Sequence, residues 1–103
     1  MQRVAESIQW NPAQHFRVVE LAEECGMSTD HFIRCFKQQR GITPGEWIIQ
    51  CRMNEARQLL LMTNESVTGI ARRLNYPDVH TFARQFKRKV GLPPGRFRDL
   101  RGT

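Results

Sequence analysis

The chain has 103 residues, with 16 lysines and arginines against 10 aspartates and glutamates, and a formal net charge of +6 at pH 7. This length predicts one compact domain and excludes a large enzyme. A hydrophobic share of 40% and an aromatic share of 9% can form a packed core, which excludes intrinsic disorder. The three cysteines are odd in number and widely spaced, which indicates reduced thiols rather than a disulfide framework.

Membrane insertion and secretion are not expected from this sequence. It contains no run of 18 apolar residues, and its first 12 residues lack the apolar stretch of a signal peptide. Together with the reduced cysteines, this predicts a cytoplasmic protein.

The positive charge is concentrated in the last third of the chain. Residues 1–65 carry seven lysines and arginines against eight acids, whereas residues 66–103 carry nine against only Asp78 and Asp99. The first segment therefore has a net charge of −1 and the second a net charge of +7. Such an asymmetry indicates a polyanionic partner, either nucleic acid or an anionic membrane surface, although a solvated basic surface is the alternative.

The chain contains an internal repeat. Residues 32–47 and 82–97 are identical at seven of sixteen positions when aligned with an offset of 50. Upstream, residues 18–27 align with residues 67–76 at an offset of 49, so the second copy contains one extra residue. Two copies are too few for a solenoid, so the repeat predicts paired supersecondary units.

The first copy, at about residues 18–40, predicts two helices joined by a tight turn. The apolar face of the first helix has the i, i+3, i+4, i+7 spacing, at Val18, Leu21, Ala22 and Cys25. Gly26 then suits a chain that leaves a helix with positive φ, and Ser28 is a favourable N-cap. The second helix, whose inward face would hold Phe32, Cys35 and Phe36, is expected to end at Gly41.

A connecting helix is predicted at about residues 45–62, following Pro44, which suits a first helical turn. Its apolar face would hold Ile49, Met53, Ala56 and Leu60, and its polar face Arg52, Glu55 and Arg57. A helix of about 17 residues at 1.5 Å per residue would be roughly 25 Å long.

The second copy, at about residues 66–90, predicts the same arrangement. Its two apolar faces would hold Val67, Ile70, Ala71 and Leu74, then Val79, Phe82, Phe86 and Val90. Asn75 would form the turn, since asparagine tolerates a left-handed backbone, Asp78 would cap the next helix and Gly91 would end it. No segment alternates apolar and polar residues for long enough to predict a strand, so the fold class is all-α.

Two helices joined by a short turn form a helix-turn-helix unit, whose second helix can enter the DNA major groove. A single such pattern has low specificity. Here two occur in register with a basic excess, and the sequence resembles the DNA-binding domain of AraC/XylS-type transcription regulators. The resemblance is carried by ELAEECGMSTDHFIRCFKQQRGITPGEWI (20–48) and SVTGIARRLNYPDVHTFARQFKRKVGLPPGRFR (66–98).

The resemblance implies about seven helices in two helix-turn-helix subdomains on a central linker helix. It also implies a bacterial-type activator or repressor whose two recognition helices enter successive major grooves of double-stranded DNA. The sequence departs from the family pattern at Asn75 and Tyr76, where the family usually has Gly and Phe, and at Gly69, where an acidic residue is common.

The residues opposite the predicted core faces are candidates for DNA contact. The candidates for contact with base edges are Thr29, Asp30, Ile33, Arg34, His80, Thr81 and Arg84. The candidates for contact with phosphates are Lys37, Arg72, Arg73, Lys87, Arg88, Lys89, Arg96 and Arg98.

Several of these assignments have alternatives. For Arg34 and Arg84, the alternative to DNA contact is a salt bridge within the domain. Asp30 could accept a hydrogen bond from cytosine N4, cap its helix or indicate that the first motif contacts DNA less closely. His31 is expected to pack against the protein or to lie at its surface. The five aromatic residues Phe32, Phe36, Trp47, Phe82 and Phe86 are expected in the core, because base stacking would need exposed rings.

Other functional classes find little support. The cysteines and histidines lack the paired spacing of a zinc site, so we expect neither metal nor cofactor. No nucleophile, phosphate-loop or metalloprotease motif indicates an enzyme, and the apolar stripes are expected to be used in packing rather than on a membrane. A non-specific nucleic-acid or RNA-binding helical module remains the alternative, although the sequence has no RNP-type or GXXG motif.

The expected partner is thus double-stranded DNA, with RNA polymerase added if the protein is an activator, and the expected location is the nucleoid. Members of the family often add a sensing and dimerisation domain. We therefore expect this domain to be monomeric, either as a stand-alone binder or as part of a longer chain that could dimerise.

Overall fold

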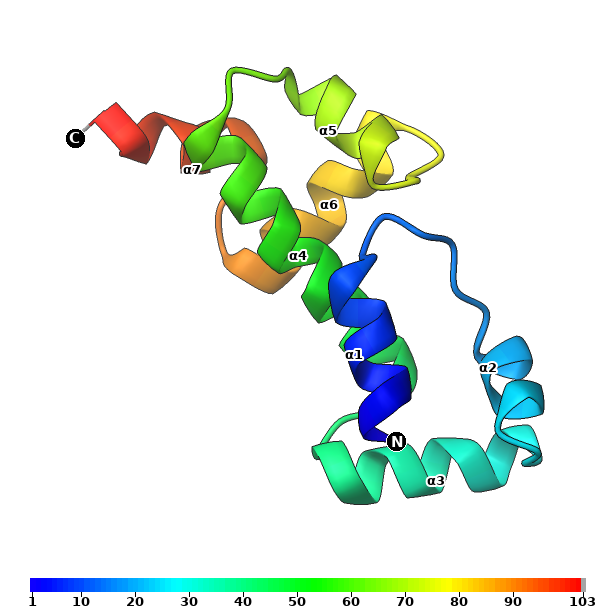
Figure 1. The fold of residues 1–103 in the computed structure, drawn as a ribbon. Coiled ribbons are helices and arrows are strands. Elements are labelled where there is room, and N and C mark those ends of the chain that lie inside the picture. The colour runs from blue at the N-terminus through cyan, green and yellow to red at the C-terminus, as the bar shows by residue number, and fades with distance from the viewer. Residues whose placement is uncertain (103) are drawn as a thin grey trace. The chain divides into compact units, whose positions relative to one another are not determined.

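The computed structural model describes residues 1–102, and every regular element in that range is helical (Figure 1). The elements are α1 (Gln2–Trp10), α2 (Val18–Glu24), α3 (Thr29–Arg40), α4 (Pro44–Met62), α5 (Val67–Arg73), α6 (Val79–Val90) and α7 (Pro94–Asp99), followed by a short 3₁₀ helix η1 (Leu100–Gly102). The expected all-α class with seven α-helices is confirmed. None of these helices is long and apolar enough to cross a membrane.

The chain divides into two compact units, Met1–Cys51 and Arg52–Thr103. Helix α4 runs without interruption through the division and supplies buried residues to both units. Each unit contains one copy of the repeat.

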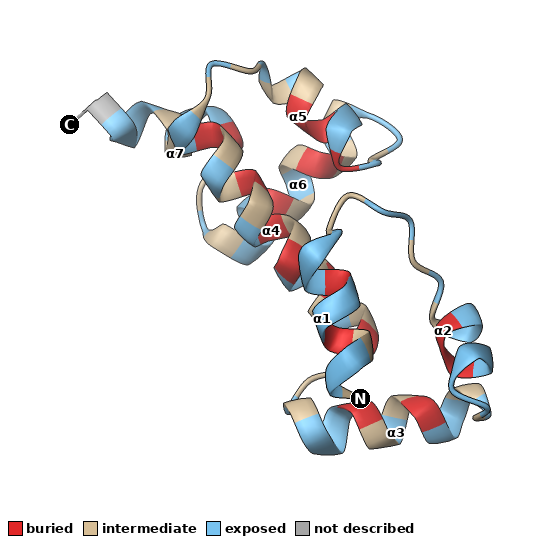
Figure 2. Cartoon of the chain, viewed as in Figure 1, coloured by how far each residue is buried: buried red, intermediate tan, exposed pale blue. Residues whose placement is uncertain are grey.

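The first unit has its own core, formed by α1, α2, α3 and the start of α4 (Figure 2). Its buried residues are Ala5, Ile8, Leu21, Ala22, Phe32, Phe36, Ile48 and Cys51. Trp47 is half-buried against this core, its ring centre 6.4 Å from that of Phe36, while its indole Nε1 donates to the backbone oxygen of Ala5 at 3.0 Å. Trp47 thus packs as expected and also satisfies its polar atom.

Cys25 does not belong to this core, which corrects the sequence prediction. Helix α2 ends at Glu24, so Cys25 is the C-cap residue and its side chain is exposed. The i+7 position of the apolar stripe therefore falls beyond the last helical residue, where the helical angle between successive side chains no longer applies.

The second unit has an equivalent core. Its buried residues are Met53, Ala56, Leu60, Ile70, Ala71, Leu74, Phe82, Phe86 and Pro94. Aromatic rings follow one another through this core, with centres separated by 5.2 Å from Tyr76 to Phe82, 5.8 Å from Phe82 to Phe86 and 5.4 Å from Phe86 to Phe97. Tilted and edge-on pairs at these distances are favourable arrangements for aromatic side chains.

Candidate nucleic-acid interface

The turn between α2 and α3 has the geometry of a helix-turn-helix unit. Gly26 has φ +68°, and its amide donates to the Glu23 oxygen at 2.9 Å. The amide of Met27 donates to the Ala22 oxygen at 3.0 Å, so two of the last carbonyls of α2 are satisfied by a left-handed turn. Ser28 then accepts from the His31 amide at 3.2 Å and caps α3, as predicted.

The turn between α5 and α6 repeats this geometry with different residues. Asn75 has φ +66°, and its amide donates to the Arg72 oxygen at 3.1 Å. The amide of Tyr76 donates to the Ala71 oxygen at 3.0 Å. The carboxylate of Asp78 caps α6 by accepting from the Thr81 amide at 2.7 Å, and this hydrogen bond lowers the pKa of Asp78. The predicted roles of Asn75 and Asp78 are confirmed.

Both second helices are fixed by a pair of phenylalanines and end in the same way. Phe32 and Phe36 on α3, and Phe82 and Phe86 on α6, are completely buried. Gly41 and Gly91 end the two helices with φ +85° and +102°, and each amide donates to a lysine oxygen four residues earlier at 2.8 Å. The buried pair in each helix turns the opposite face toward solvent.

The structure places all seven candidate base-contacting residues on α3 and α6. Asp30, Arg34, His80 and Arg84 are exposed, and Thr29, Ile33 and Thr81 are half-buried. Within residues 1–102, neither Arg34 nor Arg84 forms an ion pair at 4.0 Å or less. The structure therefore does not support the alternative in which Arg34 and Arg84 form salt bridges within the domain.

The cap proposed for Asp30 is wrong, because Ser28 already occupies the N-cap of α3. Asp30 lies in the first helical turn with its side chain exposed. A carboxylate at this place is favoured by the partial positive charge of the helix N-terminus.

Seven of the eight candidate phosphate-contacting residues have exposed side chains. These are Lys37, Arg72, Arg73, Lys87, Arg88, Lys89 and Arg96. The guanidinium of Arg73 also pairs with the Glu65 carboxylate at 3.1 Å. In an exposed position such a pair contributes little to stability, so it does not remove Arg73 from the group.

Arg98 differs from the other candidates. It is half-buried, and its Nε donates to the Leu60 oxygen at 3.0 Å while its Nη2 lies 3.4 Å from the Thr63 oxygen. These carbonyls lie at and just beyond the C-terminal end of α4, where a cation is favourable. We therefore correct Arg98 from a phosphate-contacting residue to a cap of α4. Arg101 donates to the same two oxygens.

Sequence reasoning missed a set of polar contacts around α6. The hydroxyl of Tyr76 donates to Oε1 of Gln85, and the Arg52 guanidinium lies 5.5 Å from the centre of the Tyr76 ring. Burial raises the pKa of Tyr76, and the charge and hydrogen bond of Arg52 partly oppose this. The only signal in the sequence is a tyrosine where the resembled family has phenylalanine.

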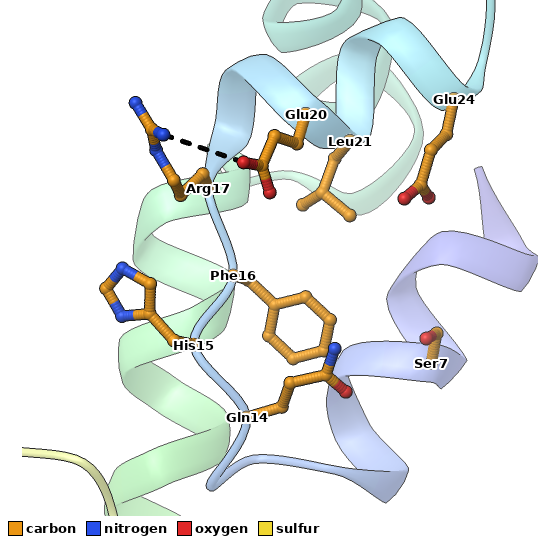
Figure 3. A pocket seen from close by; sticks show the side chains of 8 residues that line it. All are labelled: Ser7, Gln14, His15, Phe16, Arg17, Glu20, Leu21 and Glu24. Carbon is orange, nitrogen blue, oxygen red and sulfur yellow. Dashed lines mark ion pairs between the residues drawn. The ribbon is translucent and has the colours of Figure 1, made fainter.

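A cavity of about 140 Å³ lies outside the two recognition helices, in the first unit (Figure 3). It is lined by Ser7, Gln14, His15, Phe16, Arg17, Glu20, Leu21 and Glu24. In Figure 3 the Phe16 ring points toward α1, and an ion pair of 3.5 Å joins Arg17 to Glu20. No group of three or more histidine, cysteine or acidic side chains in residues 1–102 is arranged to hold a metal ion.

Comparison with known proteins agrees with this geometry. A family model described as a helix-turn-helix domain matches residues 21–100. An HTH-type transcriptional regulator of Mycobacterium tuberculosis is 37% identical over 82 residues, which cover 80% of this chain and 32% of that protein. The chain spans 28–46% of the length of the first curated relatives that it matches.

Two solved structures have the same fold over nearly the whole chain. The C-terminal domain of AraT, a response regulator from Geobacillus stearothermophilus, has a TM-score of 0.90 and 31% identity, covering 97% of this chain and 84% of that one. The DNA-binding domain of AdpA, a global transcriptional factor solved in complex with a target DNA, has a TM-score of 0.83 and 29% identity, covering 94% and 90%.

Proposed function

The chain belongs to the AraC-type helix-turn-helix family of transcription regulators. We propose that it binds specific sequences of double-stranded DNA. The observation that carries the proposal is the repeated geometry of the two motifs. In each, two buried phenylalanines hold a recognition helix whose solvent face presents an exposed arginine and lysine, Arg34 and Lys37 in α3 and Arg84 and Lys87 in α6.

Side-chain chemistry separates the expected base contacts from the expected phosphate contacts of each recognition helix. Arg34 and Arg84 occupy equivalent repeat positions, and a guanidinium can bind guanine O6 and N7 with two hydrogen bonds. Thr29, Asp30 and Ile33 on α3, with His80 and Thr81 on α6, would supply the other base contacts. The other candidate cations would contact phosphates; with Arg98 left out, these are Lys37, Arg72, Arg73, Lys87, Arg88, Lys89 and Arg96.

The first experiment is selection of duplexes from a random pool by the full chain at about 0.15 M salt. Enrichment of a defined motif is the expected result. Protection of two patches about 10–10.5 base pairs apart would support entry of α3 and α6 into successive major grooves. A pool without an enriched motif would contradict sequence-specific binding and favour the alternative, a non-specific nucleic-acid or RNA-binding module.

Two variants of α6 separate base contact from phosphate contact. Arg84→Ala should cost about 1–3 kcal/mol on the selected site and relax the preference at one base position. Lys87→Ala should weaken binding to all duplexes alike and reduce the slope of log K against log salt by about 1. If the two variants behave identically, the division into base and phosphate contacts is wrong.

We propose a binding role rather than catalysis, and RNA polymerase as a further partner if the protein activates transcription. Support for the first point comes from the relatives, most of whose names describe transcription regulators. A transcription assay on a promoter that carries the selected site tests the second. A rise in transcript at equal DNA occupancy would indicate contact with the polymerase, and a fall would indicate repression.

A further inference from the structure

A series of side-chain contacts in the second unit connects α4 to the recognition helix α6. The Arg52 guanidinium of α4 lies 5.5 Å from the centre of the Tyr76 ring. Tyr76, half-buried at the end of the turn, donates its hydroxyl proton to Oε1 of Gln85. Its ring also packs against Phe82, with 5.2 Å between the centres. These contacts therefore connect α4, the turn before α6 and α6 itself through Tyr76.

The hydrogen bond between Tyr76 and Gln85 has a defined direction. The Tyr76 hydroxyl is the donor, so its partner on Gln85 must be an acceptor. In Gln85 the only acceptor is the amide oxygen, which therefore turns toward Tyr76. The amide NH₂ group of Gln85 is then directed away from Tyr76 and is available only as a donor.

Gln85 lies on the flank of α6, between its inward and outward faces. At roughly 100° per residue, it is displaced from both the buried pair Phe82 and Phe86 and the outermost residue, Arg84. It is half-buried, and it lies one helical turn from Thr81 and from Arg88. When a helix occupies the major groove, its outermost side chains meet the base edges and its flanks face the phosphates.

We propose that Tyr76 is a positioning residue that holds the Gln85 amide so that its NH₂ group donates a hydrogen bond to a phosphate oxygen of bound DNA. This inference rests on the proposed function. A phenylalanine at position 76 would keep the ring contacts with Phe82 but would release the amide to rotate. The tyrosine at this position thus converts a flexible amide into an oriented donor.

The test measures the affinity of the full chain for its selected duplex over a series of salt concentrations. Tyr76→Phe should weaken binding by about three- to tenfold, the loss expected for one neutral hydrogen bond. Gln85→Met should weaken it by at least as much, and the double variant should bind no more weakly than Gln85→Met alone. The salt slope should not change in any of them, because neither side chain is charged.

Thr63→Val is the matched control. The Thr63 hydroxyl also donates within the second unit, to the Leu59 oxygen at 2.6 Å, but at the end of α4. This variant should bind DNA within twofold of the wild type, and circular dichroism should show that every variant is folded at the temperature of measurement. A purely structural role for Tyr76 would instead make the two hydroxyl deletions alike in DNA affinity.

The outcomes distinguish the two proposals. A wild-type chain that enriches no duplex overturns the proposed function. A wild-type chain that binds its site, together with a Tyr76→Phe variant within twofold of it, overturns only the positioning role. Additive losses in the double variant would also overturn it, as would a changed base preference in Tyr76→Phe, since the amide would then contact a base.

Discussion

At the scale of single residues, two positions determine whether each motif can turn. Gly26 and Asn75 both adopt a left-handed backbone with nearly equal φ, although only one of them is glycine. For a residue with a Cβ atom this conformation costs roughly 1–2 kcal/mol, less for asparagine, whose side chain can bond locally. The two copies of the repeat have therefore met one backbone requirement with different side chains.

Substitution of Gly26 should reveal this requirement. A Cβ atom at Gly26 would meet no atom within 4 Å, so the cost of Gly26→Ala is conformational rather than steric. We expect it to lower the free energy of unfolding by about 1–2 kcal/mol, measured by urea denaturation. Gly45→Ala is the control: this site in α4 is equally open but lacks the positive φ, so the change should be neutral or stabilising by up to about 1 kcal/mol.

The Asp78 cap predicts a dependence of stability on pH. The hydrogen bond from the Thr81 amide favours the carboxylate and lowers the pKa of Asp78 from its ordinary 3.8. A group with a depressed folded pKa stabilises the fold above its unfolded pKa, and this contribution is lost as the pH falls through the folded pKa. Asp78→Asn should therefore lower the melting temperature at pH 7, and the difference from wild type should shrink below about pH 4.

The serine cap of α3 supplies a control, because serine does not titrate in this pH range. Ser28→Ala removes the capping hydrogen bond of α3, so the loss in melting temperature relative to wild type should be the same at pH 7 and below pH 4. An Asp78→Asn difference that is equally constant with pH would show that the charge of Asp78 does not contribute to the cap.

The sequence predicts the turn and core residues better than the surface cations. Gly26, Asn75 and the four buried phenylalanines follow from local rules on φ and from helical periodicity. The role of Arg98 does not, because its carbonyl partners are 35–39 residues away in the sequence. Positive charge alone cannot distinguish an arginine that faces DNA from one that caps a helix.

At the scale of elements, the end of α4 depends on two arginines from the C-terminal segment. Arg98 and Arg101 both donate to the oxygens of Leu60 and Thr63, which α4 leaves without partners of its own. The last turn of α4 itself contains no basic residue. Residues far along the chain thus supply the positive charge that a helix C-terminus favours.

Arg98 and its neighbour Arg96 can separate helix capping from DNA binding. Arg98→Met keeps the aliphatic stem and should lower the free energy of unfolding by about 1–3 kcal/mol through the lost charged hydrogen bonds, without changing the salt slope of DNA binding. Arg96→Met alters an exposed residue, so it should change stability by less than about 0.5 kcal/mol but weaken DNA binding. The reverse pattern in thermal denaturation and DNA titration would restore Arg98 as a phosphate contact.

The helices themselves were predictable where both periodicity and end signals are present. Helix α4 begins at Pro44 and ends at Met62, close to the expected 45–62, and α6 lies between its predicted cap and glycine. Helix α1 was implied only by family resemblance. It buries just Ala5 and Ile8 and has no side-chain cap, so its periodicity is too short to stand out in the sequence.

At the scale of the whole molecule, the net charge divides between the two structural units as it does between residues 1–65 and residues 66–103. Residues 1–51 carry five lysines and arginines against six acids, a net charge of −1, and residues 52–103 carry eleven against four, a net charge of +7. Phosphate attraction scales with the number of cations that displace counterions. We therefore expect the second unit to supply most of the salt-dependent affinity and the first to add selectivity.

This asymmetry can be tested with two double variants of equal charge. Lys87→Ala with Arg88→Ala removes two exposed cations from α6, whereas Arg3→Ala with Arg17→Ala removes two exposed cations of the first unit that are not candidate contacts. The α6 pair should reduce the slope of log K against log salt by about 2, and the control pair by much less. Because both change the net charge by two units, equal reductions would mean that DNA senses the overall charge of the protein. A reduction confined to the α6 pair would instead assign the affinity to local phosphate contacts of the second motif.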